Sequence, residues 1–265
     1  MGTCTNTLTF NIASTAGLYS EVSGLLAGFA FATMTLLVAP YIIPGNSSAT
    51  IPLGDLARIL MSTFIILVLT SIGYAVLNGE SIPAGRAATE EGVLGTAFGV
   101  ALVLIVYTIV LVFDEVEAAN PGNDIGKAAK FARIILAVPM TWLVSIYICA
   151  GLGDYEHTRF GPDGAGWTFE IVALAALGLQ LFFNIYIYFF WSPVPWSPGA
   201  RAKALNLLAY ISLGVVAAAA LGVGVLGSLA NSPCVTPPMV FEYVILFLNI
   251  GLMSTMTFYL VKSRR

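Results

Sequence analysis

The stretch VLGTAFGVALVLIVYTIVLVF, from Val93 to Phe113, decides the fold class of this chain. It runs for 21 residues without a charged side chain. A helix needs about 20 apolar residues to cross the roughly 30 Å hydrocarbon core of a bilayer. Residues 205–230 form a second uncharged run that is longer still. Both stretches predict membrane-spanning helices.

The composition of the whole chain agrees with this prediction. Of the 265 residues, 58% are hydrophobic and only 9% are charged, against roughly 25% charged residues in an ordinary soluble domain. This number of charged residues is too small to cover the surface of a soluble fold. Lipid must therefore surround most of the protein. Membrane lipids are therefore the expected partners. No basic patch indicates nucleic acid, and the alternation of a β-barrel is absent.

Clusters of Pro, Gly, Asn and Ser divide the chain into seven apolar segments, because these residues end helices. The predicted spans are residues 18–43, 53–78, 93–113, 131–151, 167–191, 205–230 and 239–261. We therefore predict an all-α integral membrane protein, a seven-transmembrane helix bundle. Residues 1–17 would form a short outer tail, 18–261 the membrane domain, and 262–265 a basic inner tail.

The distribution of charge predicts the orientation of the bundle. Cytoplasmic loops carry an excess of Lys and Arg, and an inner C-terminus places nine of the eleven basic residues inside. The N-terminus is then outside, together with nine of the fourteen acids. The basic residues assigned to the inner side are Arg58, Lys127, Lys130, Arg133, Arg201, Lys203, Lys262, Arg264 and Arg265. A bacterial-type plasma membrane is the expected location.

Four outer acids each open a predicted helix: Glu21, Glu91, Glu170 and Glu242. One interpretation is a negatively charged outer mouth that concentrates cations. The alternative is that these acids complement the positive end of the helix dipole. Both interpretations stay open at this point.

Charged residues on the inner side suggest a gate or a lipid contact. Arg133 lies near the inner start of the fourth span, where a charge needs water, a lipid phosphate or a carboxylate. The candidate carboxylate partners are Asp114, Glu115 and Glu117. The alternative is ordinary anchoring, in which Arg133 and Lys130 extend to the interface.

A second charged pair lies at the inner start of the second span. Asp55 and Arg58 are one helical turn apart, so they can form a local ion pair or seal an inner gate.

Polar residues also occur in the middle of predicted spans. Gln180 and Asn184 lie one turn apart in the fifth span, and Asn249 lies mid-span in the seventh. Asn184 and Asn249 are expected to meet, either as helix-to-helix hydrogen bonds or around a ligand. Pro139 should kink the fourth span and free the carbonyl of Ile135, giving a hinge or a packing feature.

Small residues and cysteines suggest further contacts. The pairs Gly24/Gly28 and Gly95/Gly99 have the GxxxG spacing that lets helices approach, within one chain or in a homo- or hetero-oligomer. Cys4 and Cys234 both fall outside in the predicted topology. They are expected either to form a disulfide or to remain two free thiols.

The sequence gives little support for catalysis, so a membrane enzyme is the least favoured of three hypotheses for its function. His157 is the only histidine and is predicted to lie in a loop, so bis-histidine haem and zinc are not expected. No lysine lies in the middle of a predicted span, so a retinal Schiff base is not expected. No metal or cofactor is predicted.

Besides a membrane enzyme, two functions are hypotheses. The first is a non-catalytic accessory or sensor subunit that docks a partner within the bilayer. The second is a homo-oligomeric channel or transporter for cations or small solutes. The scarcity of charge in the spans favours the first, and the acidic outer side favours the second.

Overall fold

The computed structural model of the protein describes residues 12–42, 53–79, 85–119, 125–161, 167–191, 197–229 and 240–262. Helices account for nearly all of these residues: α1 (Ile12–Ile42), α2 (Leu53–Asn78), α3 (Gly85–Ala119), α4 (Ile125–Ile135), the π-helix η1 (Leu136–Met140), α5 (Thr141–Phe160), α6 (Trp167–Phe189), α7 (Pro198–Leu229) and α8 (Val240–Lys262). Because α4, η1 and α5 follow one another without a break, they form one span. Among the described residues, seven helices are long and apolar enough to cross a membrane. The predicted seven-span helical bundle is confirmed.

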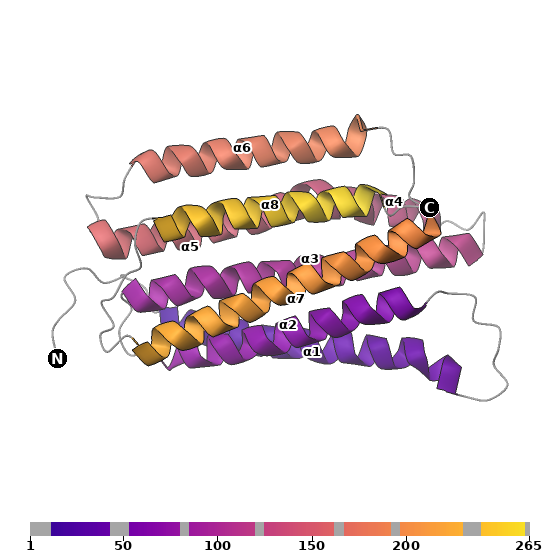
Figure 1. The fold of residues 1–265 in the computed structure, drawn as a ribbon, viewed down its shortest axis with the longest axis horizontal. Helices are drawn as coiled ribbons and strands as arrows, with labels where there is room; N and C mark the ends of the chain where they lie inside the picture. The colour runs from indigo at the N-terminus through magenta and orange to yellow at the C-terminus, as the bar shows by residue number, and fades with distance from the viewer. Residues whose placement is uncertain are drawn as a thin grey trace.

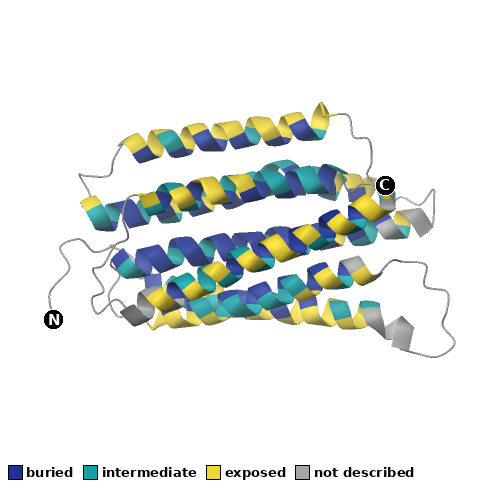
Figure 2. Ribbon diagram, viewed as in Figure 1, coloured by how far each residue is buried: buried dark blue, intermediate teal, exposed yellow. Residues whose placement is uncertain are grey.

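Helix α3 is the centre of the bundle. Figure 1 shows the helices lying side by side along one axis, with α6 at one edge and α1 near the other. Between these edges, α3 packs against α1, α2, α5, α7 and α8. In its most apolar stretch 61% of the residues are buried, against 17% in the corresponding stretch of α1. Figure 2 shows the same contrast, with exposed residues along most of α1 and α6. These two helices therefore present apolar side chains to lipid.

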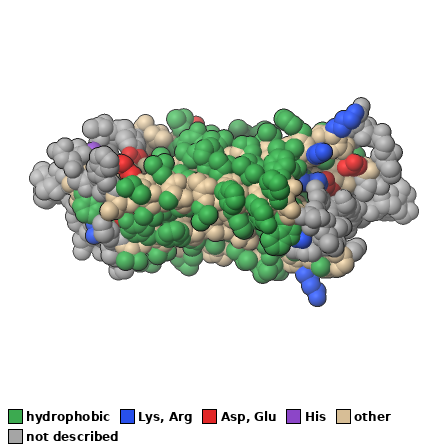
Figure 3. Space-filling model, turned by 90° about the horizontal axis from the view of Figure 1, so that it is seen from above, with side chains coloured by type: hydrophobic (Ala, Val, Ile, Leu, Met, Phe, Trp, Pro, Cys, Tyr) green, Lys and Arg blue, Asp and Glu red, His purple; other side chains and the backbone are tan. Residues whose placement is uncertain are grey.

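The bundle has two chemically different ends. Figure 3 shows hydrophobic side chains along the middle of the molecule, with charged side chains near its ends. Because the seven spans alternate in direction, the start of α1 and the end of α8 lie at opposite ends. We call one end the basic end; it holds Arg58, Lys127, Lys130, Arg133, Arg201, Lys203 and Lys262. The other is the acidic end; it holds Glu21, Glu90, Glu91, Asp154, Glu156, Glu170 and Glu242.

Several helices extend beyond the predicted spans at the acidic end. Helix α1 begins at Ile12 rather than residue 18, and α3 begins at Gly85 rather than residue 93. Ile12 is 1% exposed and belongs to a core cluster with Leu77 and Ala88. These apolar contacts between helix ends stabilise helical turns outside the spans that were predicted from hydropathy.

The prediction that His157 lies in a loop is wrong. Helix α5 continues to Phe160 and ends at Gly161, whose φ of 80° suits a glycine at a helix C-terminus. The backbone N–H of Gly161 donates to the carbonyl of His157 at 2.9 Å. Tyr155 and Glu156 are buried, at 0% and 1% exposure, so packing against neighbouring helices keeps this polar segment helical.

Candidate functional site

A groove with a volume of about 490 Å³ lies between four helices. We call it the groove. Its walls come from α1, α2, α3 and α5, and its two polar corners are Glu91 on α3 and Asp154 on α5. Both carboxylates lie about two turns from the acidic end of their helices. The groove therefore starts near the acidic end and continues into the bundle.

Glycines on α3 form the floor of the groove. Gly92, Gly95 and Gly99 recur at spacings of three and four residues, which places them on one face of the helix. A Cβ atom added at Gly95 would meet only the Tyr74 hydroxyl, 3.9 Å away, whereas one at Gly99 would overlap the side chain of Val144. The missing side chains create the space, and at Gly99 they also let α3 approach α5.

Three aromatic rings pack together on one wall of the groove. The ring centroids of Tyr19 and Tyr74 are 5.2 Å apart, and those of Tyr19 and Phe98 are 5.7 Å apart. Tyr74 and Phe98 meet edge to face at 6.4 Å. Tyr147 on α5 lines the opposite wall. Such geometries suit the quadrupoles of aromatic rings, and the faces of the rings attract cations.

Two carboxyl groups are the acidic groups of the groove. Glu91 lies within electrostatic reach of Asp154 and of the Tyr74 hydroxyl. One carboxylate oxygen of Glu91, Oε2, is buried and accepts no hydrogen bond from the described residues. No Lys, Arg or His is among the described residues that line the groove. The cavity is therefore partly apolar, holds two carboxyl groups, and has no basic partner among the described residues that line it.

The four acids predicted to form an outer mouth do not share this groove. Only Glu91 lines it. Glu21 and Glu170 are exposed on α1 and α6. Glu170 lies in the first turn of α6, where an acid complements the helix dipole, whereas α1 begins at Ile12 and so Glu21 lies beyond its first turn. Glu242 is 0% exposed and lies within electrostatic reach of Glu156 and Arg159 on α5. The groove instead brings Glu91 together with Asp154.

The mid-span polar residues meet at the π-helix. Proline has no N–H, so Pro139 cannot donate to Ile135. The backbone N–H of Thr141 is shared between the carbonyls of Leu136, five residues back, and Val138. The carbonyl of Ala137 accepts the hydroxyls of Thr141 and Thr257, both at 3.0 Å. The Thr257 hydroxyl also lies 3.2 Å from the carbonyl of Met253 in its own helix. Pro139 thus produces a π-helical turn, and a threonine from α8 binds the carbonyl that this turn exposes.

Asn184 and Asn249 are linked through α5. Asn184 donates to the hydroxyl of Thr141 at 3.0 Å, and Gln180 donates to the carbonyl of the same residue at 3.3 Å. Asn249 donates to the hydroxyl of Ser145 at 3.0 Å. The predicted cluster of Gln180, Asn184 and Asn249 therefore surrounds one segment of α5 and joins it to α6 and α8.

The hydroxyls fix the orientation of these amides. Thr141 and Ser145 donate to backbone carbonyls in their own helix, so their oxygens accept from the amide nitrogens of Asn184 and Asn249. The three amide oxygens of Gln180, Asn184 and Asn249 then point elsewhere. They are buried and have no hydrogen-bond donor among the described residues.

The candidate inner gate contains a buried ion pair. Arg133 donates to the carboxylate of Asp114, and their side chains are 10% and 4% exposed. Arg201, on α7, also lies within electrostatic reach of Asp114. Of the three candidate partners of Arg133, the structure pairs it with Asp114, whereas Glu117 is exposed. The side chain of Glu115 lies outside the described residues.

The other predicted inner residues do not join this pair. Arg58 donates to the side chain of Asn206 on α7 at 2.7 Å, and Lys130 is exposed on α4. The side chain of Asp55 lies outside the described residues. So do Cys4 and Cys234, and therefore the predicted disulfide; Cys149 is a free, half-buried thiol.

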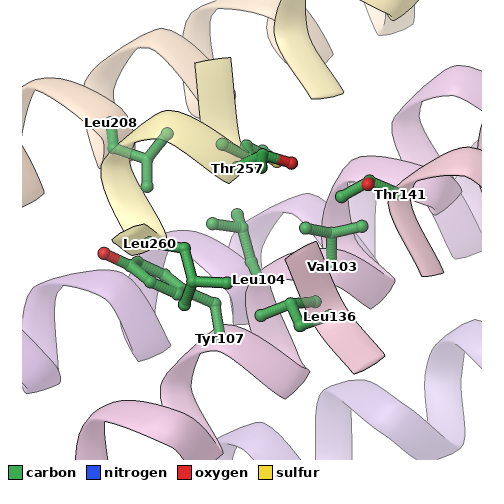
Figure 4. Close-up of a pocket in the computed structure, with 9 residues that line it drawn as sticks. Val103, Leu104, Tyr107, Leu136, Thr141, Leu208, Thr257 and Leu260 are labelled. Atoms are coloured by element: carbon green, nitrogen blue, oxygen red, sulfur yellow. The ribbon is translucent and has the colours of Figure 1, made fainter. Parts of the chain in front are cut away.

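A second, much smaller cavity lies beside the π-helix. Figure 4 shows Thr141 and Thr257 at its edge among apolar side chains that include Leu104 and Leu136. Its volume is about 10 Å³, and a single water needs roughly 10–15 Å³. This space suits a packing defect or one water, and is far too small for a ligand.

Sequence reasoning missed most of the groove. It took Gly95 and Gly99 as a packing motif, and Asp154 was not among its candidate site residues. The aromatic residues Tyr19, Tyr74 and Phe98 gave no signal, because they lie on three different helices. The repeat of glycines along one face of α3 was the one available sign of a cavity.

Comparisons with protein-family models, with curated proteins and with solved structures found no match to this chain. The groove and the polar cluster at the π-helix are therefore interpreted from their own chemistry.

Proposed function

We propose that the protein is a non-catalytic membrane sensor subunit that binds a small organic cation in the groove. One observation carries this proposal: Glu91 and Asp154 share a cavity with three packed aromatic rings, and no basic residue is among the described residues that line it. A ligand with an ammonium group would supply the missing positive charge.

Three physical arguments support a cation as the ligand. A carboxylate held away from bulk water is stabilised by an opposite charge. The faces of Tyr19, Tyr74 and Phe98 attract a cation, an interaction worth about 2 kcal/mol when the cation is desolvated. The volume of about 490 Å³ lies in the range of roughly 300–1,000 Å³ that is typical of small-molecule sites.

The proposed orientation places the groove on the outside. The basic end faces the cytoplasm of a bacterial-type plasma membrane, following the bias of Lys and Arg. The acidic end, with Glu91 and Asp154, then faces out. In this orientation the protein samples cations outside the cell, as a sensor would.

The docking of a partner within the bilayer is the second half of the proposal. Of the two GxxxG pairs, Gly95 and Gly99 face the groove inside the chain. Gly24 lies near the Ser71 hydroxyl of α2, whereas Gly28 is exposed and has nothing within 4 Å of an added Cβ atom. Gly28 is thus the position at which a helix of a partner, or of a second copy, can approach α1. Gly28→Leu should reduce the mass of the complex extracted in mild detergent, and an unchanged mass would count against docking here.

A homo-oligomeric channel or transporter is the alternative function. The π-helix at Pro139 favours it, because such turns occur often at functional sites and interrupt a span at mid-depth. Proteoliposomes loaded with tetramethylammonium distinguish the two functions. Release of the cation that depends on the protein would replace the sensor by a carrier or channel.

Binding itself is tested by titrating tetramethylammonium into the protein in lipid discs and measuring the heat. We expect saturable binding that Glu91→Gln and Asp154→Asn each weaken by about tenfold or more, since each removes a charge partner. Glu170→Gln is the matched control, because Glu170 is an exposed acid at the same end of the bundle. Absence of binding to a protein that melts normally would refute the proposed function.

A further inference from the structure

The groove is polar at one end and apolar at the other. Its carboxylates, Glu91 and Asp154, lie near the acidic end of the bundle, and Leu102 and Val144 lie at its deep end. Leu102 follows Glu91 by eleven residues, and a helix rises 1.5 Å per residue, so the groove extends about 16 Å along α3. A small ammonium ion would occupy only the polar end of a groove of this length.

One side of the groove is open to lipid. Within the described residues, α1 and α5 form two of its walls but do not pack closely against each other. Tyr19 on α1 and Tyr147 on α5 both line the groove, and yet they are 37% and 74% exposed. These tyrosines lie within membrane-spanning helices. A ligand can therefore enter sideways from the bilayer.

We propose, resting on the proposed function, that the ligand is a membrane-dissolved amphiphile with an ammonium head group and a single alkyl chain. The head group lies between Glu91 and Asp154 and against the aromatic rings. The alkyl chain of the ligand lies over Gly95 and Gly99 and ends at Leu102. This match of charge at one end and apolar length at the other distinguishes an amphiphile from a compact cation.

The bilayer itself already solvates an alkyl chain, so the chain gains little from burial alone. The alkyl chain contributes to binding through close contact with the walls of the groove. A bulky residue at the deep end should prevent this contact. Leu102→Trp fills that end and leaves Glu91, Asp154 and the aromatic rings unchanged. Leu179→Trp is the matched control, because Leu179 is 68% exposed on α6 and faces lipid.

The experiment measures binding of radiolabelled dodecyltrimethylammonium and tetramethylammonium to the full-length protein. The protein is held in bilayer discs of an uncharged galactolipid, and protein-free discs give the background. At equal mole fraction in the bilayer, dodecyl sulfobetaine and a dodecyl glucoside test the need for a net positive head group. We expect Leu102→Trp to weaken dodecyltrimethylammonium binding by about tenfold and to leave tetramethylammonium within about twofold.

The outcomes separate this inference from the proposed function. If both cations bind and Leu102→Trp weakens neither, the ligand is a compact cation and the amphiphile is refuted. If neither cation binds to the folded protein, the proposed function fails as well. If the glucoside binds as tightly as the ammonium compound, the head-group assignment to Glu91 and Asp154 is wrong. A melting temperature of Leu102→Trp close to that of the parent excludes misfolding as the cause of lost binding.

Discussion

The hydroxyl of Thr257 on α8 donates a hydrogen bond to the carbonyl of Ala137, 3.0 Å away, in the one turn of the fourth span that is not α-helical. In a regular helix that carbonyl would accept from the backbone N–H of Thr141. The π-helical turn directs this N–H to the carbonyls of Leu136 and Val138 instead. A defect in one helix thus provides a binding point for another.

The first prediction concerns this hydrogen bond. Thr257→Val should lower the free energy of unfolding by about 1 kcal/mol, because the carbonyl of Ala137 loses its hydroxyl donor from α8. The measurement is reversible unfolding in mixed micelles. Thr33→Val is the control, since the Thr33 hydroxyl is exposed and bonds within its own helix, at 2.8 Å from the carbonyl of Phe29. Equal losses in the two variants would contradict the role given to Thr257.

The second prediction separates the two interpretations of the amide cluster. Asn184→Leu loses one hydrogen bond to Thr141, and it also removes an amide oxygen that has no donor among the described residues. If the cluster only joins helices, these effects nearly cancel and the change in stability stays below about 1 kcal/mol. A loss of about 3 kcal/mol or more would show that water or a ligand holds that oxygen. Unfolding of Asn184→Leu and of Asn249→Leu in the same micelles gives the answer.

The third prediction concerns the buried ion pair between Asp114 and Arg133. Asp114→Asn should destabilise the protein by about 3–5 kcal/mol, because it leaves the Arg133 charge buried with a weaker partner. The double variant Asp114→Asn with Arg133→Met should recover most of this loss, since no unpaired charge then remains. Arg201 also interacts electrostatically with Asp114. The double variant loses this interaction too, so the recovery of stability should be incomplete. A double variant as unstable as the sum of the single variants would show that the pair does not interact.

The fourth prediction concerns the contact between α3 and α5. Gly99→Ala places a methyl group against Val144 and should destabilise the protein by about 1–3 kcal/mol, the usual effect of overpacking. Val144→Ala in the same chain makes room and should restore much of the stability. Gly28→Ala is the control, because nothing lies within 4 Å of its added methyl group. A Gly99→Ala variant as stable as Gly28→Ala would contradict the close packing.

The sequence was sufficient for the number and position of the spans, and for one of the contacts between them. Long uncharged runs and Pro/Gly clusters marked the seven helices because lipid imposes length and apolarity on any span. Asp114 was already a candidate partner for Arg133, because the two lie on either side of one short loop and a buried charge requires an opposite one.

The groove could not be predicted, for a physical reason. The helices are apolar all round, so no stripe of hydrophobic residues shows which face turns inward. Glu91 and Asp154 each have a sufficient local explanation at a helix end, and only the packing of α3 against α5 shows that they lie together. For Pro139 the sequence predicted a freed carbonyl, but not that a π-helical turn would present Ala137 to Thr257.

The π-helical turn also has a consequence for changes of chain length. A turn closed by i to i+5 hydrogen bonds holds one residue more than the α-turn that it replaces. Deleting Pro139 would therefore convert this turn into a regular one and leave the phase of α4 relative to α5 nearly unchanged. Elsewhere in the seven spans, loss of one residue rotates the rest of the helix by about 100°. The middle of the fourth span is thus a place where this bundle can shorten by one residue without changing which side chains face its neighbours.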